Sequence, residues 1–156
     1  MRCPWRELLG LGLTLALAQS GAAAQQVREL GVQAITTFSD PALVVAGAYG
    51  ALRVSGRTRV SLGLGVGASE GAAAFRGELL GHFLLSPAEL RKAGFYLAGG
   101  VASVVGPVDR GYLVLTAGVE QHPARGSGWA LELGVGGGVR LAVAHRWRWF
   151  SGFQHQ

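Results

Sequence analysis

Residues 129–149 alternate in character with a period of two. The odd positions are almost all apolar or aromatic, and the even positions carry most of the charged residues of the segment. Alternate side chains of an extended strand point to opposite faces, so the pattern predicts strand rather than helix. One face bears Trp129 near its start and Trp147 and Trp149 at its end, whereas the other carries Glu132, Gly134, Arg140, Arg146 and Arg148.

The length of this segment indicates a hairpin. A single strand of these residues would extend about 70 Å at about 3.4 Å per residue, but an apolar band about 25 Å tall, crossed at about 40°, needs only about 33 Å of strand. The three glycines at 136–138 can adopt the positive φ of a tight turn. We therefore expect strands at 129–135 and 139–149, with Trp129 roughly opposite Trp147 and Leu133 opposite Val143.

Similar patterns occur earlier in the chain. The clearest is at 58–68, where aliphatic residues at even positions alternate with Arg59, Ser61 and three glycines. Turn-forming residues separate the candidate strands, and Pro87 begins a possible single helical turn at 87–92. Together with the terminal hairpin the total is eight strands, the others being expected at 28–37, 42–54, 58–68, 72–85, 95–105 and 112–121. The orientation of 95–105 stays open, because its two faces are poorly distinguished.

The composition is apolar but contains no obvious membrane-spanning helix. Hydrophobic residues occupy 49% of the 156 positions, and the mean hydropathy is +0.32. Beyond the N-terminus the longest uncharged run, 93–108, contains paired glycines and Pro107 and is shorter than the roughly 18 to 20 apolar residues that a spanning helix needs. Because only helices and closed barrels satisfy every backbone polar group in hydrocarbon, the chain is predicted to be all-β. The expected fold is an antiparallel up-and-down transmembrane β-barrel, most simply of eight strands.

Residues 1–24 are predicted to be a secretory signal peptide. Arg2 and Arg6 precede an apolar stretch at 8–18, and a run of alanines ends at Ala24. The apolar stretch is too short for a membrane anchor, and Cys3, the only cysteine, lies before it rather than at a lipoprotein cleavage site behind it. Export without disulfides is typical of the bacterial envelope, so we expect cleavage near Ala24 and a single β-barrel domain at 25–156.

The net charge of +5 does not indicate a nucleic-acid partner. Nearly all the basic residues are Arg, with Lys92 the only lysine, and they are scattered through turns and opposite strand faces. A nucleic-acid interface would gather its cations on one face with interleaved aromatic residues. We therefore expect no nucleic-acid binding.

No catalytic, cofactor-binding or metal-ligating residue is predicted, and the chain is not expected to be an enzyme. His82 lies near Arg76 and Glu78, but no serine stands at a spacing typical of a hydrolytic site. The histidines beyond residue 24 are far apart, and the glycines at 134–138 are followed by neither a Lys-Ser/Thr pair nor a helix, so metal and phosphate sites are disfavoured. The favoured interpretation is a buried ion network in a lumen filled by side chains, formed by Arg76, Glu78, His82, Glu120, Glu132 and Arg140.

With its alternating strands, their even number and aromatic residues near strand ends, the chain resembles the small eight-stranded outer-membrane β-barrel proteins of Gram-negative-type bacteria. The resemblance covers 25–156 and rests on architecture rather than on a specific motif. It implies a monomer in the cell outer membrane, in contact with outer-membrane lipid, and insertion by the barrel assembly machinery through an alternating final strand that ends on aromatic residues. It also implies an apolar lipid-facing band, a packed polar interior and aromatic girdles, here Phe38, Phe95, Tyr96, Tyr112, Trp129, Trp147 and Trp149.

Two functions remain open at this point. The first is a non-enzymatic integral outer-membrane barrel with an envelope structural or surface-interaction role, whose short connections near Ser39, Glu70, Val108 and Gly137 face outward while the longest, near Glu89, faces the periplasm. The alternative is a soluble periplasmic β-barrel that binds a small apolar ligand, because alternation alone does not say which face points inward. A solvated outer face should carry many Lys, Glu, Thr and Asn residues. Here the second face is mainly Gly, Ala and a few Arg and Glu, which favours the membrane barrel.

Overall fold

The computed structural model describes residues 27–85, 93–107 and 109–150. The predicted signal peptide at 1–24 and the helical turn at 87–92 lie outside these residues. All eight expected strands are confirmed, and each observed boundary lies within two residues of the expected one. The strands are β1 (Val27–Phe38), β2 (Leu43–Arg53), β3 (Thr58–Ser69), β4 (Ala72–Leu84), β5 (Ala93–Val105), β6 (Arg110–Gln121), β7 (Ser127–Val135) and β8 (Val139–Phe150).

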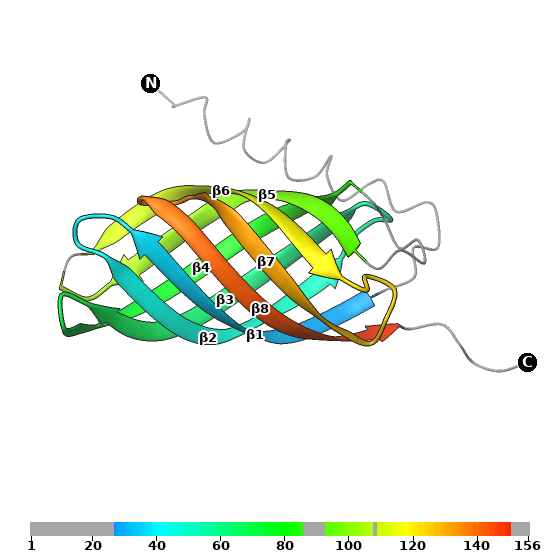
Figure 1. Ribbon diagram of the computed structural model, residues 1–156, viewed down its shortest axis with the longest axis horizontal. Coiled ribbons are helices and arrows are strands. Elements are labelled where there is room, and N and C mark those ends of the chain that lie inside the picture. The colour runs from blue at the N-terminus through cyan, green and yellow to red at the C-terminus, as the bar shows by residue number, and fades with distance from the viewer. Residues whose placement is uncertain (1–26, 86–92, 108, 151–156) are drawn as a thin grey trace, which may run out of the picture.

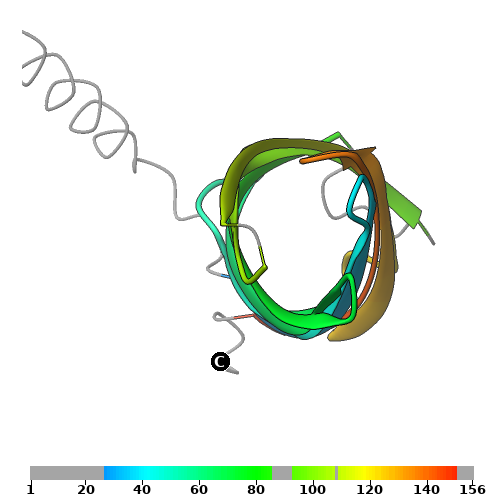
Figure 2. The same cartoon turned by 90° about the vertical axis from the view of Figure 1, so that its left-hand side faces the viewer.

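The strands form a closed antiparallel barrel. Each strand pairs with the next along the chain, and β8 pairs with β1 to complete the ring. The closing seam runs from the pair Val27↔Phe150 to the pair Phe38↔Val139. Figure 1 shows the strands tilted around the barrel axis, and Figure 2 shows the closed ring from one end. Closure leaves neither β1 nor β8 with a free edge, and the expected up-and-down topology is confirmed.

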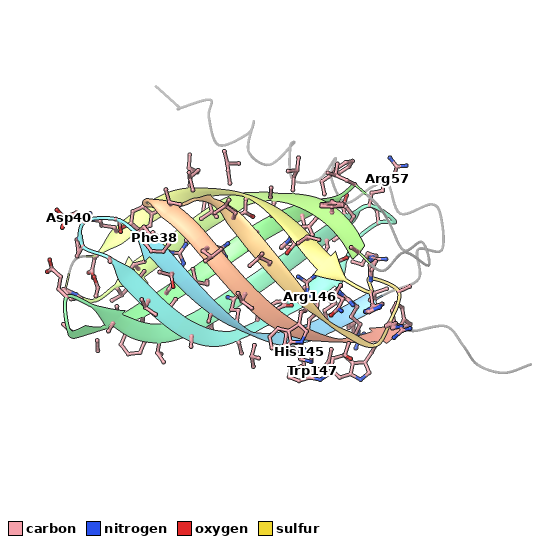
Figure 3. The ribbon with its side chains drawn as sticks, viewed as in Figure 1. Phe38, Asp40, Arg57, His145, Arg146 and Trp147 are labelled. Atoms are coloured by element: carbon pink, nitrogen blue, oxygen red, sulfur yellow. The ribbon has the colours of Figure 1, made fainter. Side chains whose placement is uncertain are left out.

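The two ends of the barrel differ in their connections. Val27 and Phe150 lie together at one end, here called the terminal end. The opposite end, here called the loop end, carries the short connections 39–42, 70–71, 106–109 and 136–138. Phe38 and Asp40 lie at the loop end in Figure 3, and Arg57 lies at the terminal end.

The apolar face of each strand points outward. On β3, Leu62 and Leu64 are 57% and 65% exposed, whereas Arg59 and Ser61 are buried in the lumen. Exposed large apolar side chains occur on all eight strands, whereas charged and small residues face inward together with a smaller number of apolar ones, such as Ile35 and Leu80. The described residues include no helix of the length and apolarity needed to span a membrane.

Two tyrosines are not part of the aromatic girdles, which corrects the prediction. Tyr96 on β5 points into the lumen and is 1% exposed, and Tyr112 on β6 packs against a buried apolar cluster that includes Ile35. The inward position of Tyr96 fixes the orientation of β5, whose faces the sequence did not distinguish. The hydroxyl of Tyr96 finds polar partners in the lumen, at Glu132 and Arg146. The predicted girdle residues that do face outward are Phe38, Phe95, Trp129, Trp147 and Trp149.

β7 and β8 form the expected hairpin, but its register differs from the prediction by two residues. Trp129 lies opposite His145 rather than Trp147, and Leu133 lies opposite Leu141 rather than Val143. The pairing is symmetric about Gly137, whereas the predicted pairs required a turn centred one residue later. Gly137, with a φ of 80°, adopts a conformation that favours glycine.

The β7–β8 hairpin is shorter than the other hairpins at the loop end. β6 begins at Arg110 but pairs with β7 only from Leu115 onward. In Figure 1 the orange hairpin ends short of the other connections at the loop end. The glycines of its turn pack against β6, because the side chains of Val114 and Tyr112 lie against Gly136 and Gly137.

Candidate functional site in the barrel lumen

The lumen contains a dense group of buried charged side chains. Five arginines and four glutamates of the described residues are buried there. Each stands at an inward position of its strand, next to at least one apolar residue of the outward face. We call this group the lumenal ion network: Glu29, Arg59, Arg76, Glu78, Glu120, Glu132, Arg140, Arg146 and Arg148.

Toward the terminal end the network is centred on Glu120 of β6. Oε2 of Glu120 accepts hydrogen bonds from Arg59 at 3.1 Å, from Arg148 at 3.2 Å and from Arg146. Arg59 also donates to both carboxylate oxygens of Glu29, at 3.2 and 3.3 Å. Three arginines therefore share two carboxylates. This sharing offsets the high cost of placing isolated charges away from water.

A second group lies farther along the lumen, on β4, β7 and β8. Arg140 donates to Oε1 of Glu78 at 2.9 Å and to Oε2 of Glu132 at 2.7 Å. Nε of Arg76 donates to Oε2 of Glu78 at 3.1 Å. Here two arginines face two glutamates, and Arg140 holds the carboxylates of two different strands.

Tyr96 connects the two groups. Its hydroxyl donates to Oε1 of Glu132 at 2.8 Å and accepts a hydrogen bond from Arg146 at 3.2 Å. The ring lies over Gly118, its cross-strand neighbour on β6, where a Cβ atom would come within 2.6 Å of the tyrosine hydroxyl oxygen. Tyr49 covers Gly31 on β1 in the same way. Each large aromatic ring thus fits because the residue opposite it is glycine.

His82 does not belong to a hydrolytic triad. Ser61 Oγ lies 2.8 Å from Nε2 of the ring, and Arg59 Nη2 lies 3.3 Å from Nδ1. In a triad the second ring nitrogen is held by a carboxylate, which stabilises the positive charge that the imidazole acquires. A guanidinium stands at that position here, so the third group has the wrong sign of charge. The adjoining cavity is about 20 Å³, which leaves no room for a lipid substrate.

The predicted ion network is confirmed but was incomplete. The six residues predicted for it are all buried in the lumen, but His82 contacts Arg59 of the network and forms no ion pair with the described residues. Sequence reasoning missed Glu29, Arg59, Arg146 and Arg148, although each lies at an inward position of the alternating pattern. The missing signal was pairing across the barrel, because Arg59 and Glu120 are distant in the sequence and on strands that are not neighbours.

The histidines do not gather into a metal site. The described part of the chain contains no group of three or more His, Cys, Asp or Glu side chains that could hold a metal ion. His145 is on the outer wall, where its ring centroid lies 4.7 Å from that of Trp129 and 4.9 Å from that of Trp147. Figure 3 shows His145 and Trp147 on the outside of the barrel near the terminal end. His155 lies outside the described residues.

Comparison with solved structures supports the fold. The chain is similar to the N-terminal β-barrel domain of Pseudomonas aeruginosa OprF, with a TM-score of 0.62 and 10% identity over 78% of this chain and 97% of that chain. It is also similar to Neisserial surface protein A, with a TM-score of 0.55 and 9% identity over 78% of this chain and 96% of that chain. The de novo designed protein TMB2.3 matches with a TM-score of 0.56 and 16% identity over 81% of this chain and 96% of that chain.

No protein-family model matches the chain, and no curated protein sequence matches it. The similarity therefore lies in the fold rather than in the sequence. That fold is the eight-stranded transmembrane barrel of outer-membrane proteins.

Proposed function

We propose that this protein is a non-enzymatic integral β-barrel of the cell outer membrane with an envelope structural or surface-interaction role. The observation that carries the proposal is the combination of an apolar outer wall with a lumen filled by paired charges. Outer-membrane lipid would contact the wall, and the barrel assembly machinery would insert the chain after export and cleavage near Ala24.

The outer wall supports contact with lipid rather than water. Exposed large apolar side chains form a band over all eight strands, with Trp129, Trp147 and Trp149 near the terminal end and Phe38 at the loop end. Soluble monomers rarely expose a continuous apolar surface of this kind. The alternative, a soluble carrier of an apolar ligand, needs the opposite arrangement of faces and is not favoured.

The lumen supports neither a general pore nor an apolar ligand site. Arg140, Arg146 and Tyr96 reach across it, and the cavities beside them and at the loop end measure about 20 and 30 Å³. An eight-stranded barrel is just wide enough for side chains to fill its interior. The Ser61, His82 and Arg59 contacts, with their wrong charge pattern for a triad, favour a structural role over hydrolysis.

The connections favour an envelope structural role over adhesion. We place both termini, at the terminal end, in the periplasm, which directs the loop end outward and gives this barrel shorter outer connections than is usual for its class. The connections there span only residues 39–42, 70–71, 106–109 and 136–138. These short connections leave only a small outward-facing surface on which a partner could bind.

Cell fractionation tests the proposal. The full chain, expressed in a Gram-negative host, should be recovered in the outer-membrane fraction, require detergent for release and begin at Gln25 by N-terminal sequencing. The unboiled protein should migrate differently in electrophoresis from the boiled one, because a closed barrel resists the detergent. Recovery in the periplasmic fraction without detergent would contradict the proposal.

A further inference from the structure

A small cavity lies inside the loop end of the barrel. It measures about 30 Å³ and opens toward the mouth of the barrel. Residues of β1 to β6 and of their loop-end connections line it together with Gly136 and Gly137 of the β7–β8 turn. Of the described residues that line this cavity, two are arginines, Arg76 and Arg110, and none is Asp or Glu.

The guanidinium of Arg76 is only partly used by the lumenal ion network. Its Nε donates to Glu78, but both terminal nitrogens, Nη1 and Nη2, are buried and have no hydrogen-bond partner among the described residues. The residue is 2% exposed. Leaving buried, charged donors unsatisfied is costly, so a partner at this position would stabilise the protein.

Thr37 provides a second unused donor to the same cavity. Its side chain is buried on β1, and Oγ1 has no hydrogen-bond partner in the described part of the chain. The two serines of the lining differ in this respect, because Ser39 donates to the carbonyl of Pro41 and Ser69 to that of Ala42. Among the described residues of the lining, the buried donors without a partner therefore belong to Arg76 and Thr37.

Arg76 also has no carboxylate of its own. Glu78, the carboxylate bound to Arg76, is already shared with Arg140. An anion in the cavity would give the terminal nitrogens of Arg76 a partner that the lumenal ion network does not supply.

We propose that this cavity, the Arg76 cavity, binds a small monatomic anion such as chloride, held by the terminal nitrogens of Arg76 and the hydroxyl of Thr37. A polar cavity needs roughly 10 to 15 Å³ to hold one water, so 30 Å³ fits an ion slightly larger than water. Phosphate and sulfate, with four oxygens each, exceed this space.

Chlorine NMR on the full chain, folded in detergent micelles, tests the proposal. Bound chloride should broaden the chlorine resonance, and bromide, but not phosphate, should reverse the broadening. Thr37→Val removes the hydroxyl while keeping the shape, and it should weaken chloride binding about tenfold, the loss expected for one hydrogen bond to a charged group. Arg76→Lys keeps the charge but not the paired nitrogens and should also weaken binding.

Thr116→Val is the matched control. Thr116 is also buried in the lumen with an unpartnered Oγ1 among the described residues, but it does not line the Arg76 cavity. Its substitution should leave chloride binding unchanged, and heat-modifiable migration confirms that each variant is folded. Absence of protein-dependent broadening, equal losses for the two threonine variants, or displacement by phosphate as effective as that by bromide would overturn the proposal.

Discussion

Each lumenal glutamate is contacted by at least two other lumenal side chains. Glu120 holds three arginines, Glu78 holds two, and Glu132 holds Arg140 and the hydroxyl of Tyr96. Removing one partner from such a group leaves the others buried and unpaired, which costs more than the pair itself contributes. Single residues of the network are therefore expected to affect stability strongly.

Glu120→Gln should lower the free energy of unfolding by about 3 to 5 kcal/mol, because Arg59, Arg146 and Arg148 lose their common carboxylate. Urea titration of the protein in lipid vesicles measures this change. Glu70→Gln, at an exposed turn position, is the control and should change stability by less than about 0.5 kcal/mol. Equal effects of the two substitutions would contradict the role of Glu120.

Gly118→Ala should destabilise the barrel by about 1 to 3 kcal/mol, since the new methyl group would overlap the ring of Tyr96. The same urea titration applies. Gly81→Ala is the control, because a Cβ there would meet only the carbonyl oxygen of Gly99, at 3.8 Å. If both variants were as stable as the parent, the fit of Tyr96 over Gly118 would not matter.

At the scale of elements, the alternation of apolar residues predicted the eight strands closely. The outward face of β3 can be predicted from its sequence, because the aliphatic residues Leu62 and Leu64 alternate with Ser61 and glycines. The orientation of β5 could not be predicted from the sequence, because its inward face carries apolar residues as well as Tyr96.

Register and pairing across the lumen could not be predicted from the sequence. With three consecutive glycines, the β7–β8 turn can be centred on Gly137 or Gly138 without a change in strand faces, and only the pairing Val135↔Val139 decides between them. The contact of Arg59 with Glu120 depends on the width and stagger of the closed barrel, which no single strand specifies. The Arg76 cavity was missed for the same reason.

The outer face of β3 provides a test at this scale. Leu62→Arg, near the middle of the strand, should cost about 2 to 4 kcal/mol in a bilayer, whereas Phe38→Arg, beside the loop-end turn, should cost at most about 1 kcal/mol. The two side chains are 57% and 59% exposed, so they differ chiefly in depth. Folding titrations in phospholipid vesicles measure both, and equal costs would contradict a lipid-facing wall.

At the scale of the whole molecule, the filled lumen predicts a barrel that does not conduct ions. Arg140 joins Glu78 and Glu132 across the interior, and the cavities near His82 and the loop end are about 20 and 30 Å³. Planar-bilayer recordings of the reconstituted protein should show no stepwise conductance above the protein-free bilayer. Reproducible unit steps would indicate a continuous path that the structure does not contain.

Tryptophan quenching tests most directly whether the apolar outer wall contacts lipid. The variant Trp5→Phe retains Trp129, Trp147 and Trp149, which all face outward near the terminal end. In vesicles, lipids brominated near the headgroup should quench their fluorescence more strongly than lipids brominated near the chain ends, and aqueous iodide should quench it weakly. Strong quenching by iodide without quenching by brominated lipid would contradict a membrane-spanning barrel with its apolar face outward.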